Sequence, residues 1–132
     1  RKAFHNGDRM NPKLLSIDHV QLAMPAGGED RARRFYGEIL GLPERPKPPH
    51  LAARGGAWFE RDHLKVHLGI DPAFAPARKA HVAFAVADLA ELTRELRAAG
   101  CEITESSDAE TRQIYIHDPF GNRLEFIEQP VK

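Results

Sequence analysis

The stretch YIHDPFGNRLE, residues 115–125, predicts two β-strands joined by a tight turn. Pro119 and Gly121 lie in the turn, because proline fixes φ and glycine accepts backbone angles that other residues avoid. Apolar and polar residues alternate on both sides, which extends the predicted strands to Arg112–His117 and Arg123–Glu128. The stretch therefore forms a β-hairpin at the C-terminal end of the chain.

A strand and a helix precede this hairpin. Alternation over Ala80–Val86 predicts a strand with one apolar face. Asp88, three residues before Glu91, is a capping-box-like start for an amphipathic helix that ends at Gly100. With a short strand near Glu102–Glu105, this half has the order strand, helix and three strands.

The first half of the chain has the same order of elements. The predicted elements are a strand over Leu14–Met24, a helix over Ala32–Leu40, two short strands near Leu51–Arg54 and around Ala57–Glu60, and a strand over His63–Ile70. Several prolines between the helix and the short strands predict an extended loop.

Equivalent residues recur in the two halves. His19 corresponds to His81, the helix-ending Gly41 to Gly100, and His67 to Glu125. This internal repeat predicts an α+β fold of two βαβββ modules, with first and last strands in equivalent positions about a pseudo-two-fold axis.

A single domain is predicted over residues 14–128. Module one covers residues 14–70 and module two residues 79–128. Residues 1–13 are interpreted as a leader or disordered extension, because their first part lacks periodicity.

Four residues that bind metals elsewhere in proteins occupy repeat-related positions: His19, His67, His81 and Glu125. Each lies on the polar face of its predicted strand, so mixed sheets from the two modules would form a cup around them. A single histidine on such a strand is usually an ordinary half-exposed residue. Four at related positions favour a metal site with open coordination positions, which is typical of catalysis.

Several motifs resemble the vicinal-oxygen-chelate superfamily, which includes glyoxalase I, extradiol dioxygenases and the fosfomycin-resistance and bleomycin-resistance proteins. The resemblance is carried by Ile17-Asp18-His19-Val20, Leu40-Gly41-Leu42, Ala80-His81-Val82-Ala83-Phe84 and, most specifically, Asp118-Pro119-Phe120-Gly121-Asn122 with Leu124-Glu125. It implies that His19, His67, His81 and Glu125 are the metal ligands. It also implies one divalent ion per site (Zn, Ni, Fe or Mn), a small substrate with neighbouring oxygens, and a homodimer.

The resemblance leaves three functions open. A glyoxalase-like lyase or isomerase ranks first, with Glu125 as both ligand and general base. Glyoxalase I usually has Glu where this chain has His67, and its glutathione-using forms have Arg where this chain has Ala23. A glutathione adduct is therefore not the expected substrate.

A single-domain extradiol-type dioxygenase ranks second among the predicted functions. It would use two histidines and one glutamate on iron, with Tyr115 as a catalytic residue ten positions before Glu125. An additional histidine typical of that class, which does not itself bind the metal, is absent from residues 106–108. A bleomycin-resistance-type binding protein without catalysis ranks third, because all four ligand positions hold ligating residues.

Further residues are candidates for the rim of the pocket. Arg54 would hold an anionic group of the substrate, and Trp58 would stack on it. Glu60 and Gln21 share the predicted cup face and could orient a ligand histidine through hydrogen bonds.

Bulk composition excludes several classes of partner. Nineteen basic and nineteen acidic residues give a formal net charge of zero, which argues against nucleic acid. No apolar run approaches the roughly 20 residues of a membrane helix, so a soluble, cytoplasmic protein is expected. The single cysteine, Cys101, excludes a disulfide within the chain and is given no role.

Overall fold

Two mixed β-sheets with the same strand order form the body of the protein, whose computed structural model describes residues 11–106, 110 and 112–129. The orders are β1-β4-β3-β2 and β5-β8-β7-β6. In each sheet the first strand of the module lies at the edge and pairs in parallel with the last. The predicted α+β fold of two βαβββ modules is confirmed.

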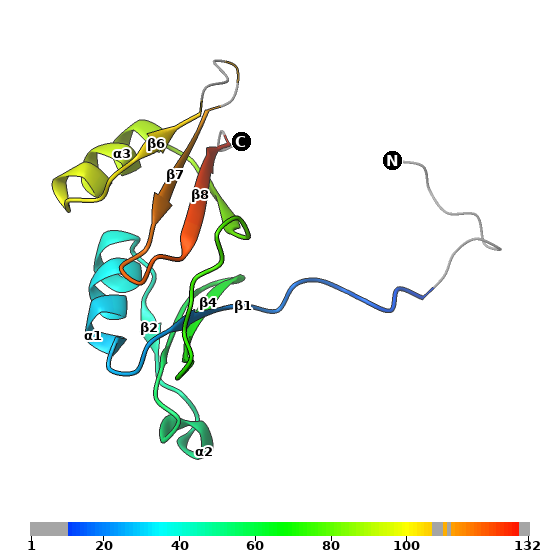
Figure 1. Ribbon diagram of the computed structural model, residues 1–132. Coiled ribbons are helices and arrows are strands. Elements are labelled where there is room, and N and C mark those ends of the chain that lie inside the picture. Colours follow the sequence, from blue (N-terminus) through cyan, green and yellow to red (C-terminus); the bar gives the residue numbers. More distant parts are fainter. Residues whose placement is uncertain (1–10, 107–109, 111, 130–132) are drawn as a thin grey trace.

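The elements of the two modules follow each other in the predicted order. Module one contains β1 (Val20–Met24), α1 (Glu29–Ala32), η1 (Arg33–Ile39), β2 (Glu44–Arg45), α2 (Pro49–Ala52), β3 (Ala57–Arg61) and β4 (Leu64–Ile70). Module two contains β5 (Val82–Val86), α3 (Leu89–Ala98), β6 (Thr104–Glu105), β7 (Gln113–His117) and β8 (Arg123–Glu128). Helices α1 and α3 lie on the same side of the two sheets (Figure 1).

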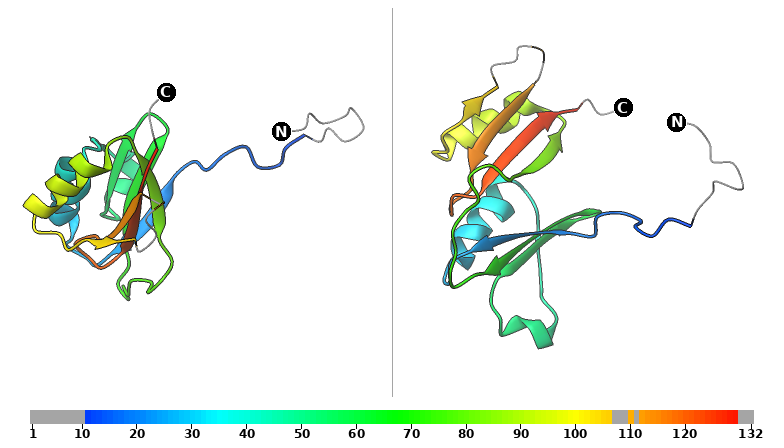
Figure 2. Two further views of the ribbon diagram at one scale, coloured as in Figure 1. Left: turned by 90° about the horizontal axis from the view of Figure 1, so that it is seen from above. Right: turned by 45° about the vertical axis from the view of Figure 1, so that its right-hand side comes forward.

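The first strand is shorter than predicted. β1 begins at Val20 rather than Leu14, and residues 11–19 extend away from the sheets (Figures 1 and 2). Val20 pairs with Val66, and the partner strand β4 itself begins at Leu64. The alternation over residues 14–19 therefore has almost no neighbouring strand with which to form hydrogen bonds. The predicted leader falls largely on residues 1–10, which lie outside the described residues.

The predicted short strand near Leu51–Arg54 is wrong. Residues Pro49–Ala52 form the helical turn α2, with Pro49 at its start, where a missing N–H costs nothing. The amide of Leu51 donates to the carbonyl of Pro48 at 2.9 Å. The short strand is instead β2, which pairs with Phe59 and Trp58 of β3.

The two helical segments differ in their regularity. Asp88 caps α3 as predicted, because its side chain accepts a hydrogen bond from the amide of Glu91 at 3.0 Å. α1 continues into the wider turns of η1, where the amide of Leu40 donates to the carbonyl of Phe35 at 2.9 Å.

Among the described helices, none is long and apolar enough to cross a membrane.

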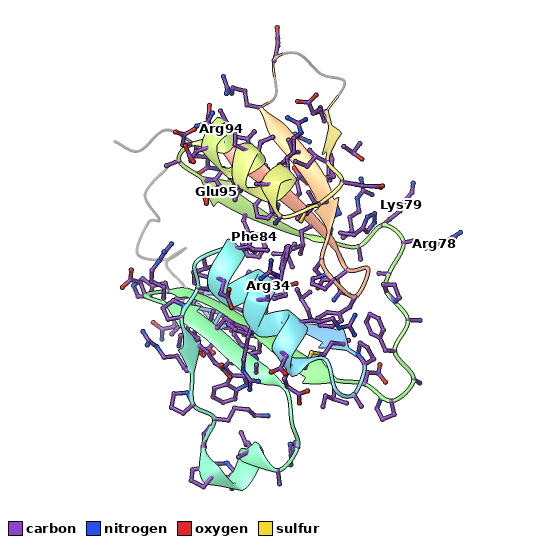
Figure 3. The ribbon with its side chains drawn as sticks, turned by 90° about the vertical axis from the view of Figure 1, so that its left-hand side faces the viewer. Arg34, Arg78, Lys79, Phe84, Arg94 and Glu95 are labelled. Carbon is purple, nitrogen blue, oxygen red and sulfur yellow. The ribbon has the colours of Figure 1, made fainter. Side chains whose placement is uncertain are left out.

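The core lies between the helices and the sheets. Its buried strand residues include Phe59, Val66, Leu68, Leu124 and Phe126. Because side chains alternate along a strand, His67 and Glu125 point to the opposite face of their sheets, away from the helices. The apolar face of β5 is only half-buried, and Phe84 lies where the two modules meet (Figure 3).

A buried hydrogen-bond network around Asp118 joins the two modules. The hydroxyl of Tyr36 in η1 donates to Asp118 Oδ2 at 2.6 Å, and Asn122 Nδ2 donates to the carbonyl of Ala23 at 2.8 Å. The other carboxylate oxygen accepts from the amides of Phe120 and Asn122 at 2.9 and 2.8 Å. Burial, together with the negative charge of Asp118, raises the pKa of Tyr36 well above its usual value. The tyrosine therefore remains a hydrogen-bond donor.

Replacing Tyr36 with Phe should lower the free energy of unfolding by about 1–3 kcal/mol, because a buried carboxylate oxygen loses a donor. Urea denaturation of the variant measures this loss. Tyr115→Phe is the control, since the Tyr115 hydroxyl is only half-buried and, within the described residues, its hydrogen-bond partner is Gln113. Equal losses in both variants would contradict a special role for the Tyr36–Asp118 bond.

Candidate metal and substrate site

The strongest pair of candidate ligands lies in module two. Ala83 of β5 is opposite Glu125 of β8, so His81 precedes that register position by two residues and faces the same way. His81 Nε2 lies 2.8 Å from Glu125 Oε1, and Glu125 is only 7% exposed. Two residues 44 positions apart in sequence thus meet on the face away from the helices.

The hydrogen bonds of His81 determine what can lie between these two atoms. Its Nδ1 is 2.7 Å from the carbonyl oxygen of Lys79, which only accepts hydrogen bonds, so Nδ1 carries a proton. When the ring is neutral and Glu125 is ionised, Nε2 presents a lone pair to the carboxylate oxygen. The 2.8 Å contact therefore requires either a proton or a metal cation between the two atoms.

The donor atoms of this pair fit a divalent metal. An imidazole whose other nitrogen donates to a carbonyl is the usual form of a ligating histidine. Two ligands each about 2.1 Å from an ion, at roughly a right angle, lie about 3 Å apart. The separation of His81 Nε2 and Glu125 Oε1, 2.8 Å, is close to that value.

Module one contains the equivalent positions with different contacts. Gln21 is opposite His67, so His19 again precedes the register position by two residues, as the internal repeat predicts. The rings of His19 and His67 stack with centroids 4.3 Å apart. His19 Nδ1 lies 2.9 Å from Asp18 Oδ1, and this hydrogen bond, with the charge of Lys65, lowers the pKa of Asp18. The ionised Asp18 accepts the Nδ1 proton, which leaves His19 Nε2 available as a ligand.

His67, like His81, contacts a carboxylate of its own module through Nε2. Nε2 lies 2.6 Å from Glu60 Oε2, so it donates its proton there when Glu60 is ionised. The ring lies between His19 and the indole of Trp58, whose centroid is 4.3 Å away at an interplanar angle of 8°. Glu60 was expected to orient a ligand histidine, and it contacts His67 directly.

The structure brings the four predicted ligands together only in pairs. His19 and His67 form one pair in module one, and His81 and Glu125 form the other in module two. Within residues 11–106, 110 and 112–129, no three His, Cys, Asp or Glu side chains are grouped as a metal site. We call the two pairs, with Glu60 and Trp58 in the first, half-site one and half-site two.

Tyr115 belongs to half-site two. It is directly opposite Glu125 in the β7–β8 register, and its ring meets that of His81 edge to face at 5.8 Å. The guanidinium of Arg123 lies 4.4 Å from the centre of the Tyr115 ring. Sequence reasoning missed Arg123, although its position two residues before Glu125 places it on the same strand face.

The two predicted substrate-binding residues differ in their placement. Trp58 lies opposite His67 in the β3–β4 register, and one face of its indole is covered by the imidazole. Arg54 is exposed after α2, and its side chain has no hydrogen-bond or ion-pair partner in the described part of the chain. The structure thus connects Trp58, but not Arg54, to the ligand residues.

This arrangement of repeated modules, with histidine and carboxylate donors on matching strands, defines a class of protein. The family model for the Glyoxalase/Bleomycin resistance protein/Dioxygenase superfamily matches residues 16–126, and the chain belongs to this superfamily. None of the curated proteins matches the chain.

Solved structures agree with this membership. A glyoxalase family protein from Bacillus anthracis is 43% identical, covering 91% of this chain and 99% of its own, with a TM-score of 0.84. A glyoxalase/dioxygenase from Nostoc punctiforme is 23% identical over 99% of both chains, with a TM-score of 0.73. The fosfomycin resistance protein FosX from Listeria monocytogenes is 17% identical over 90% of this chain and 94% of its own, with a TM-score of 0.70. The last two likenesses concern the fold alone.

Trp58, the single tryptophan, should report on half-site one. His67→Ala should shift its emission to longer wavelength and increase quenching by acrylamide, because water reaches the uncovered face of the indole. His63→Ala is the control, since His63 is exposed in the turn between β3 and β4. Unchanged emission in the His67 variant would mean that the stack is absent in solution.

Proposed function

We propose that the protein is a metal-dependent enzyme, a lyase or isomerase acting on a small molecule with two neighbouring oxygen atoms. The contact of His81 Nε2 with Glu125 Oε1 at 2.8 Å carries the proposal, because His81 Nδ1 is committed to a carbonyl oxygen. The buried carboxylate of Glu125 and the imidazole of His81 are then positioned so that both can bind one divalent cation. A glutathione adduct is not the proposed substrate, and a cytoplasmic location is part of the proposal.

Three of the four candidate ligands are assigned to the metal: His19, His81 and Glu125. Each has a nitrogen or oxygen atom that can bind the metal. Among the described residues, only another assigned ligand forms a hydrogen bond with that atom. For His67 we propose a positioning role, because its Nε2 is held by Glu60 and its ring stacks on His19. Stacking fixes the plane of His19, and an oriented ring loses less entropy when it binds an ion.

The bound metal would act as a Lewis acid that polarises the paired substrate oxygens. Glu125 has one oxygen beside His81 and is the carboxylate placed to take a proton from carbon next to a carbonyl. Tyr115 lies across the strand pair from Glu125 and is the hydroxyl group available beside it. The face of the Trp58 indole away from His67 is proposed as a flat surface for an apolar part of the substrate.

A single-domain extradiol-type dioxygenase is the second candidate. Two histidines and one carboxylate are the ligand set of many non-haem iron oxygenases, and His19, His81 and Glu125 provide that set. Tyr115 lies beside His81 and under the Arg123 guanidinium, whose positive charge favours anionic oxygens nearby. The identity of the metal separates the two candidates.

Completion of the site is proposed to require two chains, with each site built from half-site one of one copy and half-site two of the other. The two half-sites do not form a three-ligand group within the described residues of one chain. Leu14, Leu15 and Ile17 directly precede His19 and are 89%, 84% and 79% exposed. Such apolar surface beside a half-site is typical of a protein interface, and a two-fold dimer is the commonest homo-oligomer.

Metal content tests the ligand assignment. His19→Ala, His81→Ala and Glu125→Gln should each lose stoichiometric metal, whereas His67→Ala should lower affinity by about 10–100-fold, as expected for a positioning residue. Elemental analysis and titration of chelator-free protein measure these values. His117→Ala, at an exposed strand end, is the control, and circular dichroism checks folding. Equal metal content in wild type and all ligand variants would overturn the assignment.

Mixing variants tests the two-chain site. Heterodimers of His19→Ala with Glu125→Gln should regain one metal per dimer. One of the two sites then contains both substitutions, and the other site contains neither and can bind the metal. Light scattering should give a dimeric mass. A monomeric mass would exclude the dimer, and a dimer without restored binding would place each site within one chain.

The reaction class is tested with defined probes. The Zn-, Ni- or Mn-loaded protein should exchange the carbon-bound hydrogens of hydroxyacetone with deuterium from solvent, and Glu125→Gln should not. Oxygen uptake with catechol by the Fe(II)-loaded protein would favour the dioxygenase instead. Protein that purifies without metal and binds none on titration would favour a ligand-binding role.

A further inference from the structure

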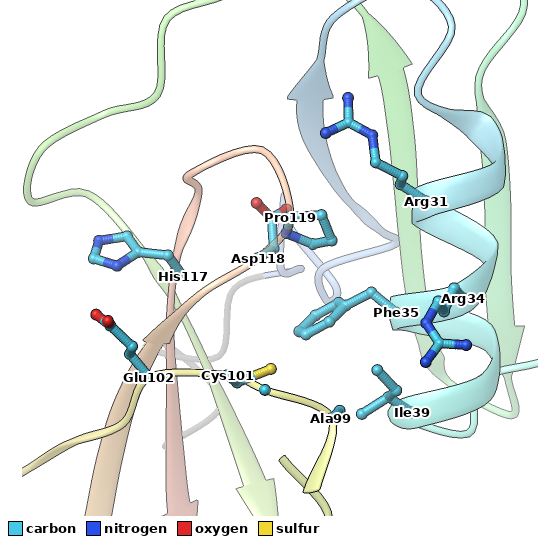
Figure 4. Close-up of a pocket in the computed structure, with 11 residues that line it drawn as sticks. Arg31, Arg34, Phe35, Ile39, Ala99, Cys101, Glu102, His117, Asp118 and Pro119 are labelled. Carbon is cyan, nitrogen blue, oxygen red and sulfur yellow. The ribbon is translucent and has the colours of Figure 1, made fainter. Parts of the chain in front are cut away.

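A pocket of about 470 Å³ opens on the helix side of the molecule, where the modules meet (Figure 4). Its module one wall is formed by α1 and η1, and its module two wall by the residues after α3 and the β7–β8 turn. The helices cover one face of the sheets, whereas His67 and Glu125 point to the other. The pocket is therefore separate from both half-sites.

The positive charges at one end of this pocket are not neutralised by neighbouring side chains. Arg33 is bound to Glu44 at 2.8 Å and to Asp30 at 3.0 Å, and it does not line the pocket. Arg31 and Arg34 do line it, and neither has a carboxylate partner in the described residues. They lie three residues apart on one helical segment. The Arg31 guanidinium lies 4.9 Å from the centre of the Phe120 ring, and the two guanidinium groups point apart in Figure 4, so rotation of these exposed side chains brings both of them to one anion.

The opposite end of the pocket carries a different charge. Glu102 and His117 lie side by side there (Figure 4). Asp118 also lines the pocket, but both of its oxygens accept hydrogen bonds from Tyr36, Phe120 and Asn122. The pocket is thus polarised, with its cationic end on α1 and η1.

Apolar groups line the space between these ends. Phe35 is 3% exposed and Ile39 is half-buried. Burial raises the pKa of the Cys101 thiol, so this side chain is an uncharged, weakly polar group at neutral pH. A ligand that spans the pocket would meet two cations at one end and an apolar surface along its body.

We infer that this pocket binds a small amphipathic carboxylate, with its anionic group at Arg31 and Arg34 and its apolar body over Phe35 and Ile39. Glu102 sets the orientation, since it repels the carboxylate from the far end. The site needs no metal and does not depend on the proposed catalytic function.

Octanoate and 1-octanol test the inference, because both are unbranched molecules of eight carbons and they differ in charge. Titration of the full chain followed by ¹H–¹⁵N NMR should shift amides around Phe35, Ile39 and Cys101. Octanoate should bind about tenfold more tightly than octanol, as expected for charge-assisted hydrogen bonds. The Arg31→Gln/Arg34→Gln double variant should bind both compounds equally.

Arg94→Gln is the matched control, since Arg94 is exposed on α3 and paired with Glu91 (Figure 3). It should keep the preference for octanoate. Glu102→Gln should keep or strengthen octanoate binding. Equal affinities of the two compounds for wild type, shifts confined to other regions, or an unchanged preference in the double variant would each overturn the inference.

Cys101 provides an independent readout, because it is the single cysteine in the chain and lines the pocket. Octanoate should slow its alkylation by iodoacetamide in wild type and in Arg94→Gln. The protection should be lost in the double arginine variant. Alkylation that octanoate does not slow, at concentrations that saturate the NMR shifts, would place the ligand elsewhere.

Discussion

The parallel pairing of the first and last strands in each module is the constraint on which the candidate site depends. The register sets Gln21 opposite His67 and Ala83 opposite Glu125, so each upstream histidine lies diagonally across from the second ligand position. A one-residue shift in either pairing would turn these side chains toward the helices. The chemistry is therefore tied to the same hydrogen bonds that hold the sheets together.

Asp118 links this constraint to the relative position of the modules. Its carboxylate accepts from Tyr36 of module one and from amides of its own turn, while Asn122 reaches the carbonyl of Ala23. The turn therefore does more than reverse the chain. It fixes the junction on which the helix-side pocket is built, and it leaves the opposite faces of both sheets free to carry ligands.

The half-sites differ in how their charges are balanced. In half-site two, His81 lies between two acceptors, so a proton or a cation must join it to Glu125. In half-site one, Glu60 already accepts from His67, and His19 is held by Asp18 and by stacking. Symmetry of backbone position thus does not produce symmetry of chemistry, because neighbouring side chains decide which ring nitrogen is free.

The sequence alone determined the strand faces, the repeat, the Asp88 cap and the hairpin around Asp118, because alternation, capping and turn chemistry depend on neighbouring residues. It also placed His19 and His81 at equivalent positions. Only the tertiary structure decided that β1 starts at Val20, since its pairing with β4 begins there, opposite Val66. The contact of Glu60 with His67, the position of Arg123 over Tyr115 and the separation of the two half-sites likewise depend on residues brought together by folding, and no local pattern encodes those distances.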